Sequence, residues 1–495
     1  MPKNRFYVTT AIPYVNAAPH IGFAFEIVQA DAIARYHRSI GDDTFFLTGT
    51  DENALKNVQS AEKSGIPVQK FVDQNSQRFE DLKGALNLSF DDFIRTTEER
   101  HILGAQKLWQ ACDPGDIYKK KYRGLYCVGC EQFYTEKELV DGKCPEHGTV
   151  PETVEEENYF FKLSKYQNRL EKLIESNELR IVPESRRNEI LSFIKGGLED
   201  FSISRSKARA KGWGIPVPGD KNQVIYVWFD ALSNYINALG YADDGEKFKK
   251  YWLSARGGSA FGGENPQRVH VIGKGIIRFH AVYWPAMLLS AGIPLPTEIF
   301  VHGYLTVDGQ KISKSLGNAT ASGGAPQDAV VIDPFALAEK YGTDPVRYYL
   351  LAKFSPFEDG DFSEAKLKET YNAGLANGLG NLVSRVAKLA EGKEIGNRKS
   401  EIGEEKYENA LENFRLDEAL AIAWSKMSEL DKYVNENKPW EKQDEALDKD
   451  LRYLISNILS LTSLLEPFLP ETAEKIRKQF AGKIKPASPL FPRLR

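Results

Sequence analysis

Residues 18–26 read APHIGFAFE, and they stand where a strand gives way to a helix. The segment before them, RFYVTTAI (5–12), is short and rich in β-branched and aromatic residues, which is typical of a buried strand. After them, apolar residues recur at helical spacing as far as Gly41, and TFFLTG (44–49) predicts a second buried strand. This strand–helix–strand order predicts an α/β fold with a Rossmann-like parallel sheet.

His20 lies at the turn between the first strand and the helix. Ligands of parallel α/β sheets bind beyond the carboxyl ends of the strands. A helix N-terminus at that edge favours phosphate, and Gly22 would let a ligand approach the backbone closely. A phosphate-site histidine and a capping or core histidine are both consistent with this segment alone.

Composition and charge set broad limits on the class of protein. The chain has 495 residues, enough for two or three domains, with 42% hydrophobic and 27% charged residues. No apolar run reaches the roughly 18 residues of a membrane span, and the N-terminus lacks the apolar core of a signal peptide. We therefore expect a cytoplasmic protein without a membrane partner. The net charge of −4 argues against a generally basic nucleic-acid binder.

Three of the four cysteines cluster in CVGCEQFYTEKELVDGKCPEH (127–147). The spacing C-x2-C, thirteen residues, C-x2-H suits four ligands around one tetrahedral Zn²⁺. We predict a structural zinc knuckle formed by Cys127, Cys130, Cys144 and His147. A disulfide or chance spacing is the alternative, and a cytosolic setting disfavours the disulfide.

The α/β pattern is interrupted between about 115 and 222 by charged, irregular sequence that contains the knuckle. It resumes at QVIYVWFDAL (223–232), RVHVIGKG (268–275) and EIFVHGYLTV (298–307). From about 358 the strand signals end, and apolar helical periodicity, as in 414–437 and 450–470, predicts an all-α bundle. We expect a discontinuous Rossmann-type domain (1–114 and 223–320), an insertion (115–222), a linking region (321–357) and a C-terminal helical domain (358–495).

A second phosphate signal is GQKISKSLGN (309–318). Lys311 and Lys314 bracket Ser313, and a loop with two lysines can neutralise charge on a leaving pyrophosphate. Exposed Lys–Ser stretches are common, so this loop alone is a weak signal. Together with His20 at the first strand–helix turn, it predicts a triphosphate site.

HIGF (20–23) with KISKS (311–315) resembles HIGH and KMSKS, the signature pair of class I aminoacyl-tRNA synthetases. The segments TTAIPYVNAAPHIG (9–22), FLTGTDEN (46–53), YVWFDALSNY (226–235) and FHAVYWPAML (279–288), with the knuckle, are similar to the methionyl-tRNA synthetase family. The motifs keep the order of that family along nearly the whole chain.

The resemblance implies a two-step ligase reaction with ATP, L-methionine and tRNA(Met). Methionine would attack the α-phosphate of ATP, and the methionyl group would pass to the tRNA for translation initiation and elongation. His20, Lys311 and Lys314 would be catalytic, with Mg²⁺ accompanying ATP. The implied ATP-binding residues are His20, Gly22, Lys274, Ser313 and Lys314.

The resemblance also implies an amino-acid pocket and an anticodon site. Asp51 would bind the α-ammonium group of methionine. The implied pocket residues are Ile12, Tyr14, Asp51, Trp228, Ala231, Tyr235 and His280. The linking region would contact the tRNA stem, and the helical domain would bind the CAU anticodon. The implied anticodon contacts are Asn377, Asn381, Arg385 and Trp440. Without the motifs, Trp228, Tyr235 and His280 would be interpreted as core residues, and Trp440 as a residue that packs at the end of the bundle.

Three positions depart from the family pattern: Phe23 replaces the second histidine of HIGH, Asn53 stands in TDENA, and Gly275 follows Lys274. We hypothesise that Asn53 replaces the donor lost at Phe23. The alternatives are a class I synthetase for another amino acid, an adenylyltransferase with a HIGH motif, and a non-catalytic tRNA-binding homologue. The bundle is followed directly by FPRLR, which leads us to expect a monomer.

Overall fold

The computed structural model describes residues 4–134, 136–145, 148–253, 265–307, 310–311, 332–395, 405–485 and 487–494. Six parallel strands form the central sheet in the order β3-β2-β1-β12-β13-β7. These strands are β1 (Arg5–Thr10), β2 (Asp43–Thr50), β3 (Asp92–Arg95), β7 (Arg180–Val182), β12 (Gln267–Gly273) and β13 (Glu298–His302). The predicted Rossmann-like parallel sheet is therefore confirmed, with the fully buried β1 at its centre.

Helix α1 (Ile21–Ile40) connects β1 to β2, as predicted. It begins after His20, whose backbone is extended, and ends at Gly41, which has φ 82° in the left-handed region that glycine adopts easily. The other helices of this region are α2 (Leu55–Ser64), α3 (Val68–Ala85), α4 (Glu99–Ala111), α7 (Val227–Leu232), α8 (Asn234–Asn237), α9 (Glu246–Tyr251), the π-helix η6 (Phe279–Tyr283) and α10 (Trp284–Ser290).

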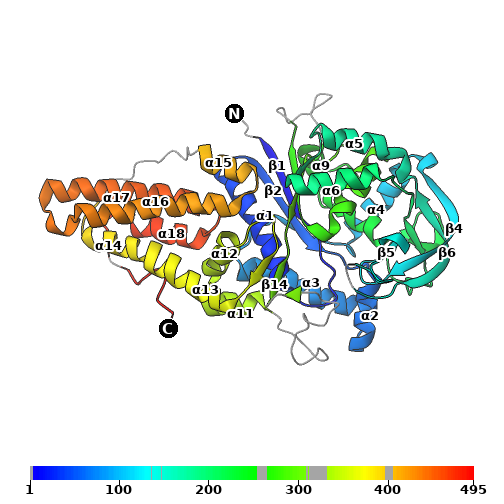
Figure 1. The fold of residues 1–495 in the computed structure, drawn as a ribbon, viewed down its shortest axis with the longest axis horizontal. Helices are drawn as coiled ribbons and strands as arrows, with labels where there is room; N and C mark the ends of the chain where they lie inside the picture. Colours follow the sequence, from blue (N-terminus) through cyan, green and yellow to red (C-terminus); the bar gives the residue numbers. More distant parts are fainter. Residues whose placement is uncertain are drawn as a thin grey trace.

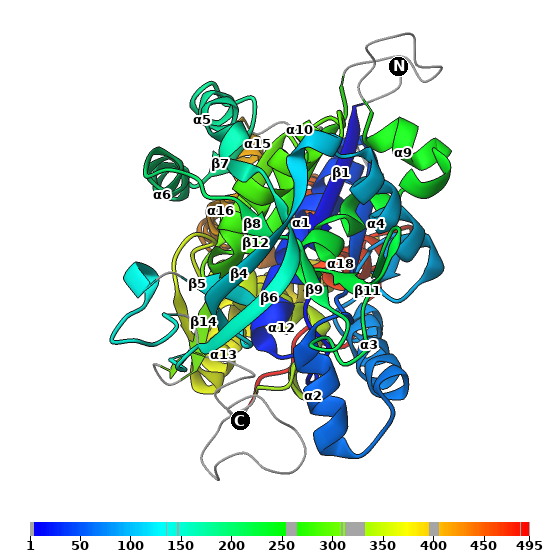
Figure 2. The same cartoon turned by 90° about the vertical axis from the view of Figure 1, so that its right-hand side faces the viewer.

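The insertion is built around a long antiparallel ribbon that curves across one end of the molecule (Figure 2). Its elements are β4 (Ile117–Cys127), β5 (Gln132–Tyr134), β6 (Glu152–Phe161), α5 (Gln167–Glu175), α6 (Glu184–Lys195), β8 (Phe201–Ser202), β9 (Ser204–Ser206), β10 (Pro216–Val217) and β11 (Asp220–Ile225).

Two details of this region differ from the sequence interpretation. Strand β7 lies within 115–222 yet joins the edge of the central sheet. Conversely, residues 223–225 belong to β11, which pairs antiparallel with β9 and β10, and residues 227–232 are helical. A short apolar run does not reveal its pairing partner, so the sequence could not separate these cases.

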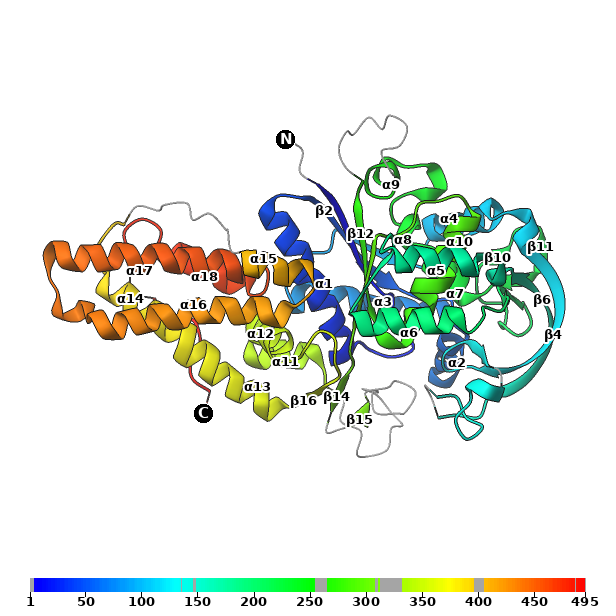
Figure 3. The same cartoon turned by 45° about the horizontal axis from the view of Figure 1, so that its top comes forward.

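The C-terminal part is predominantly helical and extends away from the sheet (Figures 1 and 3). A small sheet accompanies it, formed by β14 (Leu305–Val307), β15 (Gln310–Lys311) and, after the first two helices, β16 (Gly360–Phe362). The helices of the C-terminal part are α11 (Pro334–Tyr341), α12 (Thr343–Ala352), α13 (Glu364–Thr370), the π-helix η8 (Tyr371–Gly380), α14 (Asn381–Leu389), α15 (Glu405–Glu412), α16 (Leu416–Asn437), the 3₁₀ turn η9 (Pro439–Glu441), α17 (Asp444–Leu465) and α18 (Pro470–Gln479). The helix bundle is thus confirmed.

Arg347 joins the helical part to the sheet region. This fully buried residue of α12 forms an ion pair with Asp31 of α1, with 2.8 Å between Nη1 and Oδ2. It also donates hydrogen bonds to the carbonyl oxygens of Leu86, Pro467 and Phe468. One guanidinium group therefore fastens the turn before α18 to α1, the helix that His20 caps. Among the described residues, no helix is both long and apolar enough to span a bilayer.

Candidate active site

A cavity of about 350 Å³ lies at the carboxyl ends of the central strands. Ile12 and Tyr14 follow β1, Asp51 follows β2, and Gly273 and His302 end β12 and β13, and all of them line the cavity. This is the edge at which parallel α/β sheets bind ligands. The predicted residues that line it are Ile12, Tyr14, His20, Gly22, Asp51, Trp228, Ala231, Tyr235 and His280.

His20 is both a helix cap and part of the cavity wall. Its Nδ1 accepts a hydrogen bond from the backbone N–H of Gly22, 3.0 Å away. A Cβ atom at position 22 would lie 2.9 Å from Cε1 of the same ring, so a larger residue would displace the His20 ring from this contact. The capping interpretation and the site interpretation of His20 are therefore compatible.

Tyr235 and His280 form a buried hydrogen bond on the amino-acid side of the cavity. The Tyr235 hydroxyl lies 2.7 Å from His280 Nε2, and His280 Nδ1 lies 2.9 Å from the carbonyl oxygen of Ile276. Because that carbonyl can only accept, Nδ1 carries the proton and Tyr235 donates to Nε2. Burial lowers the pKa of His280 to about 4, so the ring is neutral near pH 7.

Asp51 is a buried carboxylate beside Tyr14, to which it is joined by a parallel bridge. Burial, followed by the repulsion of Asp230, raises the pKa of Asp51 well above its ordinary value. The backbone N–H of Asn53 donates to Oδ1 at 3.1 Å and opposes this rise. A cationic group placed here would stabilise the ionised carboxylate.

Trp228 links the cavity to the knuckle. Its ring stacks on Phe279 with 3.8 Å between centroids, and its Nε1 donates to the carbonyl oxygen of Cys130 at 3.2 Å. Nearby, the Tyr226 hydroxyl donates to the carbonyl oxygen of Glu131. Two aromatic residues at the start of α7 are therefore held by the backbone of the knuckle.

The nucleotide side of the cavity differs in part from the prediction. Lys274 is outside the cavity lining and forms an ion pair with Asp359, 2.6 Å away, although its neighbours Gly273 and Gly275 line the cavity. Phe23 lines the cavity and packs against Phe79.

The hydrogen bonds of Asn53 argue against the hypothesis that this residue replaces the donor lost at Phe23. The Asn53 side-chain amide already donates to Thr96 and Asp230. Serving as a replacement donor would require these bonds to break.

The KISKS loop lies largely outside the described residues. This applies to Ser313, to Lys314 and to the side chain of Lys311. The backbone of Lys311 belongs to β15 and pairs with Thr306 of β14.

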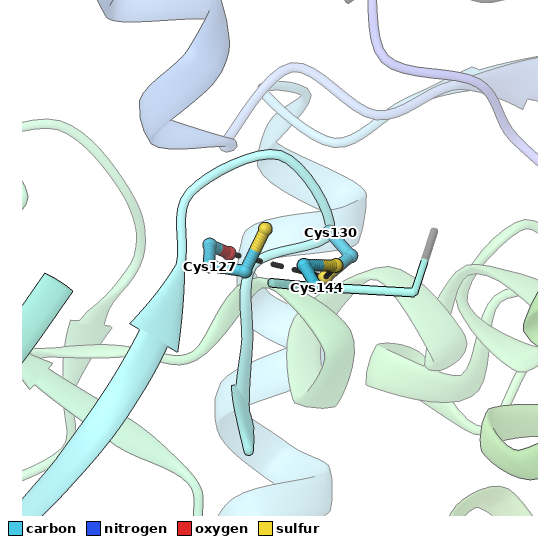
Figure 4. Close-up of side chains that lie close together, drawn as sticks. All are labelled: Cys127, Cys130 and Cys144. Atoms are coloured by element: carbon cyan, nitrogen blue, oxygen red, sulfur yellow. Dashed lines mark hydrogen bonds between the residues drawn. The ribbon is translucent and has the colours of Figure 1, made fainter. Parts of the chain in front are cut away.

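Cys127, Cys130 and Cys144 come together at the end of β4 (Figure 4). Their sulfur atoms lie within 4.8 Å of one another, and those of Cys130 and Cys144 are 3.8 Å apart. Two thiolates bound at about 2.3 Å to a tetrahedral zinc ion would be about 3.8 Å apart, so the arrangement fits the ion. Among the described cysteines none forms a disulfide, and the fourth predicted ligand, His147, lies outside the described residues.

The predicted anticodon residues lie on the helical part. Arg385 is bonded to Asp431 and Asn435, and its guanidinium lies 5.8 Å from the ring centroid of Trp440. Trp440 is 50% exposed, so much of its ring is open to solvent. Asn381 is exposed one turn before Arg385, whereas Asn377 accepts a hydrogen bond from Arg493.

Comparisons with known proteins agree with this geometry. The family described as tRNA synthetases class I (M) matches residues 6–150 and 138–387, and the anticodon-binding domain of tRNA ligase matches 401–490. The methionine–tRNA ligase of Clostridium acetobutylicum is 43% identical over 96% of this chain and 73% of its own length. That of Brucella suis is 42% identical over 99% of this chain and 96% of its own length.

Solved structures show the same relationship. The Mycobacterium tuberculosis methionyl-tRNA synthetase in complex with methionyl-adenylate has a TM-score of 0.87 and 38% identity, covering 99% of both chains. The apo form of that enzyme has a TM-score of 0.81 and 36% identity, covering 100% of this chain and 99% of its own. The chain belongs to the methionyl-tRNA synthetase family.

As a member of the methionyl-tRNA synthetase family, the protein is a methionine–tRNA ligase, an ATP-dependent aminoacyl-tRNA synthetase. The function expected from the motifs is confirmed. The comparisons do not support a class I synthetase for another amino acid or a non-catalytic homologue.

This methionyl-tRNA synthetase also has cavity residues that sequence reasoning missed. Glu26 accepts hydrogen bonds from Ala11 N at 2.9 Å and pairs with His302 at 2.9 Å, and all three residues line the cavity. Lys56 lines the cavity near Cys130. Sequence spacing could have indicated that both residues line the cavity. Glu26 lies about one helical turn after Gly22, and Lys56 follows Asp51 by five positions.

Proposed function

We propose that this cavity activates methionine, with Asp51 as the ligand of its α-ammonium group. The observation that carries the proposal is the buried Asp51 carboxylate in one cavity with the Tyr235–His280 pair and with His20. Tyr14, Trp228, Ala231, Tyr235 and His280 would enclose the thioether chain, with Ile12 beside it. Aromatic edges suit a soft sulfur atom.

The first step needs positioning and charge stabilisation more than covalent chemistry by the protein. A carboxylate oxygen of methionine bonds to the α-phosphorus of ATP, and the bond from that phosphorus to the bridging oxygen of pyrophosphate breaks. Gly22 and His20, at the N-terminus of α1, would hold the α-phosphate. Lys311, Ser313 and Lys314 would bind the departing pyrophosphate, and Lys274 would need to leave Asp359 to contribute.

In the second step, a hydroxyl oxygen of the terminal ribose of tRNA bonds to the methionyl carbonyl carbon. The bond from that carbon to the phosphate oxygen breaks, AMP leaves with the electron pair, and the hydroxyl proton is released. Asn377, Asn381, Arg385 and Trp440 would contact the CAU anticodon, where an exposed tryptophan can stack on an unpaired base. This supports tRNA(Met) as the nucleic-acid substrate.

We further propose zinc and magnesium as the metals. Cys127, Cys130, Cys144 and His147 would hold one structural Zn²⁺, which fixes the knuckle when bound. Mg²⁺ would enter with ATP.

We also propose that the protein is a cytoplasmic monomer, and light scattering would test its mass.

The domain division belongs to this proposal as well. Residues 1–114 and 223–320 would form the catalytic domain, and 115–222 the insertion. Residues 321–357 would contact the tRNA stem, and 358–495 the anticodon.

Methionine-dependent ATP–pyrophosphate exchange tests the pocket, with each of the twenty amino acids offered separately. We expect exchange with methionine alone. Tyr235→Phe removes the hydroxyl that donates to His280 and should raise the KM for methionine about tenfold. Tyr453→Phe, a change at an exposed tyrosine of α17, is the matched control. Exchange with another amino acid would overturn the pocket assignment.

A further inference from the structure

The cavity has a third wall to which the proposed contacts with methionine and ATP assign no role. The amino-acid wall is formed by residues such as Tyr235 and His280, and the nucleotide wall by His20 and the ends of β12 and β13. Lys56, Gly129 and Cys130 line the remaining side, which lies next to Trp228. We call these three residues the knuckle rim.

Lys56 places a cation on the knuckle rim. It is the second residue of α2, half-buried, and the first turn of that helix lies close to Glu131 of the knuckle hairpin. Within the described part of the chain, its ammonium group has no hydrogen bond or ion pair. Burial lowers the pKa of Lys56, and the attraction of Glu131, Cys127 and Cys130 opposes this.

The position of Lys56 is fixed relative to the reacting centre. The neighbouring side chain, Asn57, donates to the carbonyl oxygen of Asp51 at 3.0 Å, which ties the first turn of α2 to the end of β2. If Asp51 holds the α-ammonium group, the methionyl carbonyl is one carbon away from the atom that bears it. Lys56 therefore lines the same cavity as Asp51, next in sequence to the side chain that holds the main chain of the proposed ammonium ligand.

The main chain of the knuckle rim at Gly129 is suited to a nucleic-acid backbone. Gly129 has no side chain, so a ribose–phosphate chain can approach the main chain closely there. A lysine ammonium group in the same cavity is a common kind of phosphate contact. The third substrate of the reaction, tRNA, ends in a single strand whose last phosphodiester lies immediately before the terminal ribose.

We propose that Lys56 binds the last phosphodiester of the single-stranded 3′ end of tRNA, with Gly129 and Cys130 forming the facing edge of its path. The inference rests on the proposed function, since it takes Asp51 as the ammonium ligand. It assigns Lys56 to the transfer step and leaves amino-acid activation to the other two walls.

Lys56→Met separates the two steps, with Lys63→Met as the control on an exposed turn of the same helix. Exchange needs no tRNA, so it should be affected far less than transfer. Single-turnover transfer from preformed methionyl-adenylate should fall about tenfold or more in Lys56→Met. Lys56→Arg should restore most of the rate, and Lys63→Met should behave as the unchanged protein.

A chemical partner for this variant is tRNA whose last phosphodiester is replaced by an uncharged methylphosphonate. If the contact is direct, Lys56→Met and the methylphosphonate together should slow transfer no more than either change alone. Additive losses would overturn the proposal.

Three further outcomes would also overturn it: an equal loss of exchange, loss of bound zinc measured by atomic absorption, or unchanged transfer. Absence of methionine-dependent exchange in the unchanged protein would instead contradict the proposed function itself.

Discussion

At the scale of single residues, Asp51 combines a proposed binding role with a cost to stability. The folded chain raises its pKa, so between the ordinary and the raised value the native state holds more protons than the unfolded state, and stability falls as pH increases. Asp51→Asn should therefore stabilise the protein near pH 7 by about 1–3 kcal/mol while methionine-dependent exchange is lost. Asp31→Asn should instead destabilise the protein near pH 7, because the attraction of Arg347 and Arg35 outweighs burial and lowers the pKa of Asp31. Thermal melts at pH 5 and pH 8 measure both effects, and a destabilised Asp51→Asn would contradict the argument.

At the scale of elements, the knuckle supports the pocket wall through the carbonyl oxygens of Cys130 and Glu131, which accept from Trp228 and Tyr226. Cys144→Ser, or removal of the proposed zinc ion by a chelator, should raise the KM for methionine about tenfold and change tryptophan fluorescence. Cys112→Ser is the matched control, because this buried thiol contacts the core near Met287 and lies outside the cluster. Metal content, KM and emission spectra would be compared. An unchanged KM after complete metal loss would show that the pocket wall keeps its structure without the ion.

At the scale of the whole molecule, Arg347 holds the helical part against the catalytic part. Arg347→Met would leave Asp31 with one cationic partner, Arg35, and three buried carbonyl oxygens without their donor. We expect a loss of about 3–5 kcal/mol, larger than for Arg415→Met at the exposed Arg415–Glu418 pair. Asp31 contributes its stability above its unfolded pKa and loses it as pH falls through the lower folded value, so the variant should also unfold at a less acidic pH. Urea and acid titrations measure the difference, and equal losses in the two variants would refute it.

Much of this architecture follows from local sequence. The strand–helix–strand start, the knuckle spacing and the helical periodicity after residue 358 each correspond to elements of the structure. The motifs also place His20, Asp51 and Tyr235 in one cavity. The side-chain partners were not predictable in the same way. Lys274 pairs with Asp359, and Asn377 with Arg493, because residues distant in the sequence meet only in the folded chain. Strand β7 likewise gains its place in the sheet from β13, more than a hundred residues later.

The order of strands in the central sheet has a consequence for synthesis on the ribosome. Strand β1 occupies the middle of the sheet, yet its partner β12 is translated some 260 residues later. During that interval the nascent chain carries an apolar strand with one unpaired edge, which is a surface that chaperones bind and that promotes aggregation. A stalled or truncated product that ends before β12 would keep this edge open permanently. We therefore expect such fragments to be insoluble or quickly degraded, and the full-length chain to depend on chaperones early in its synthesis.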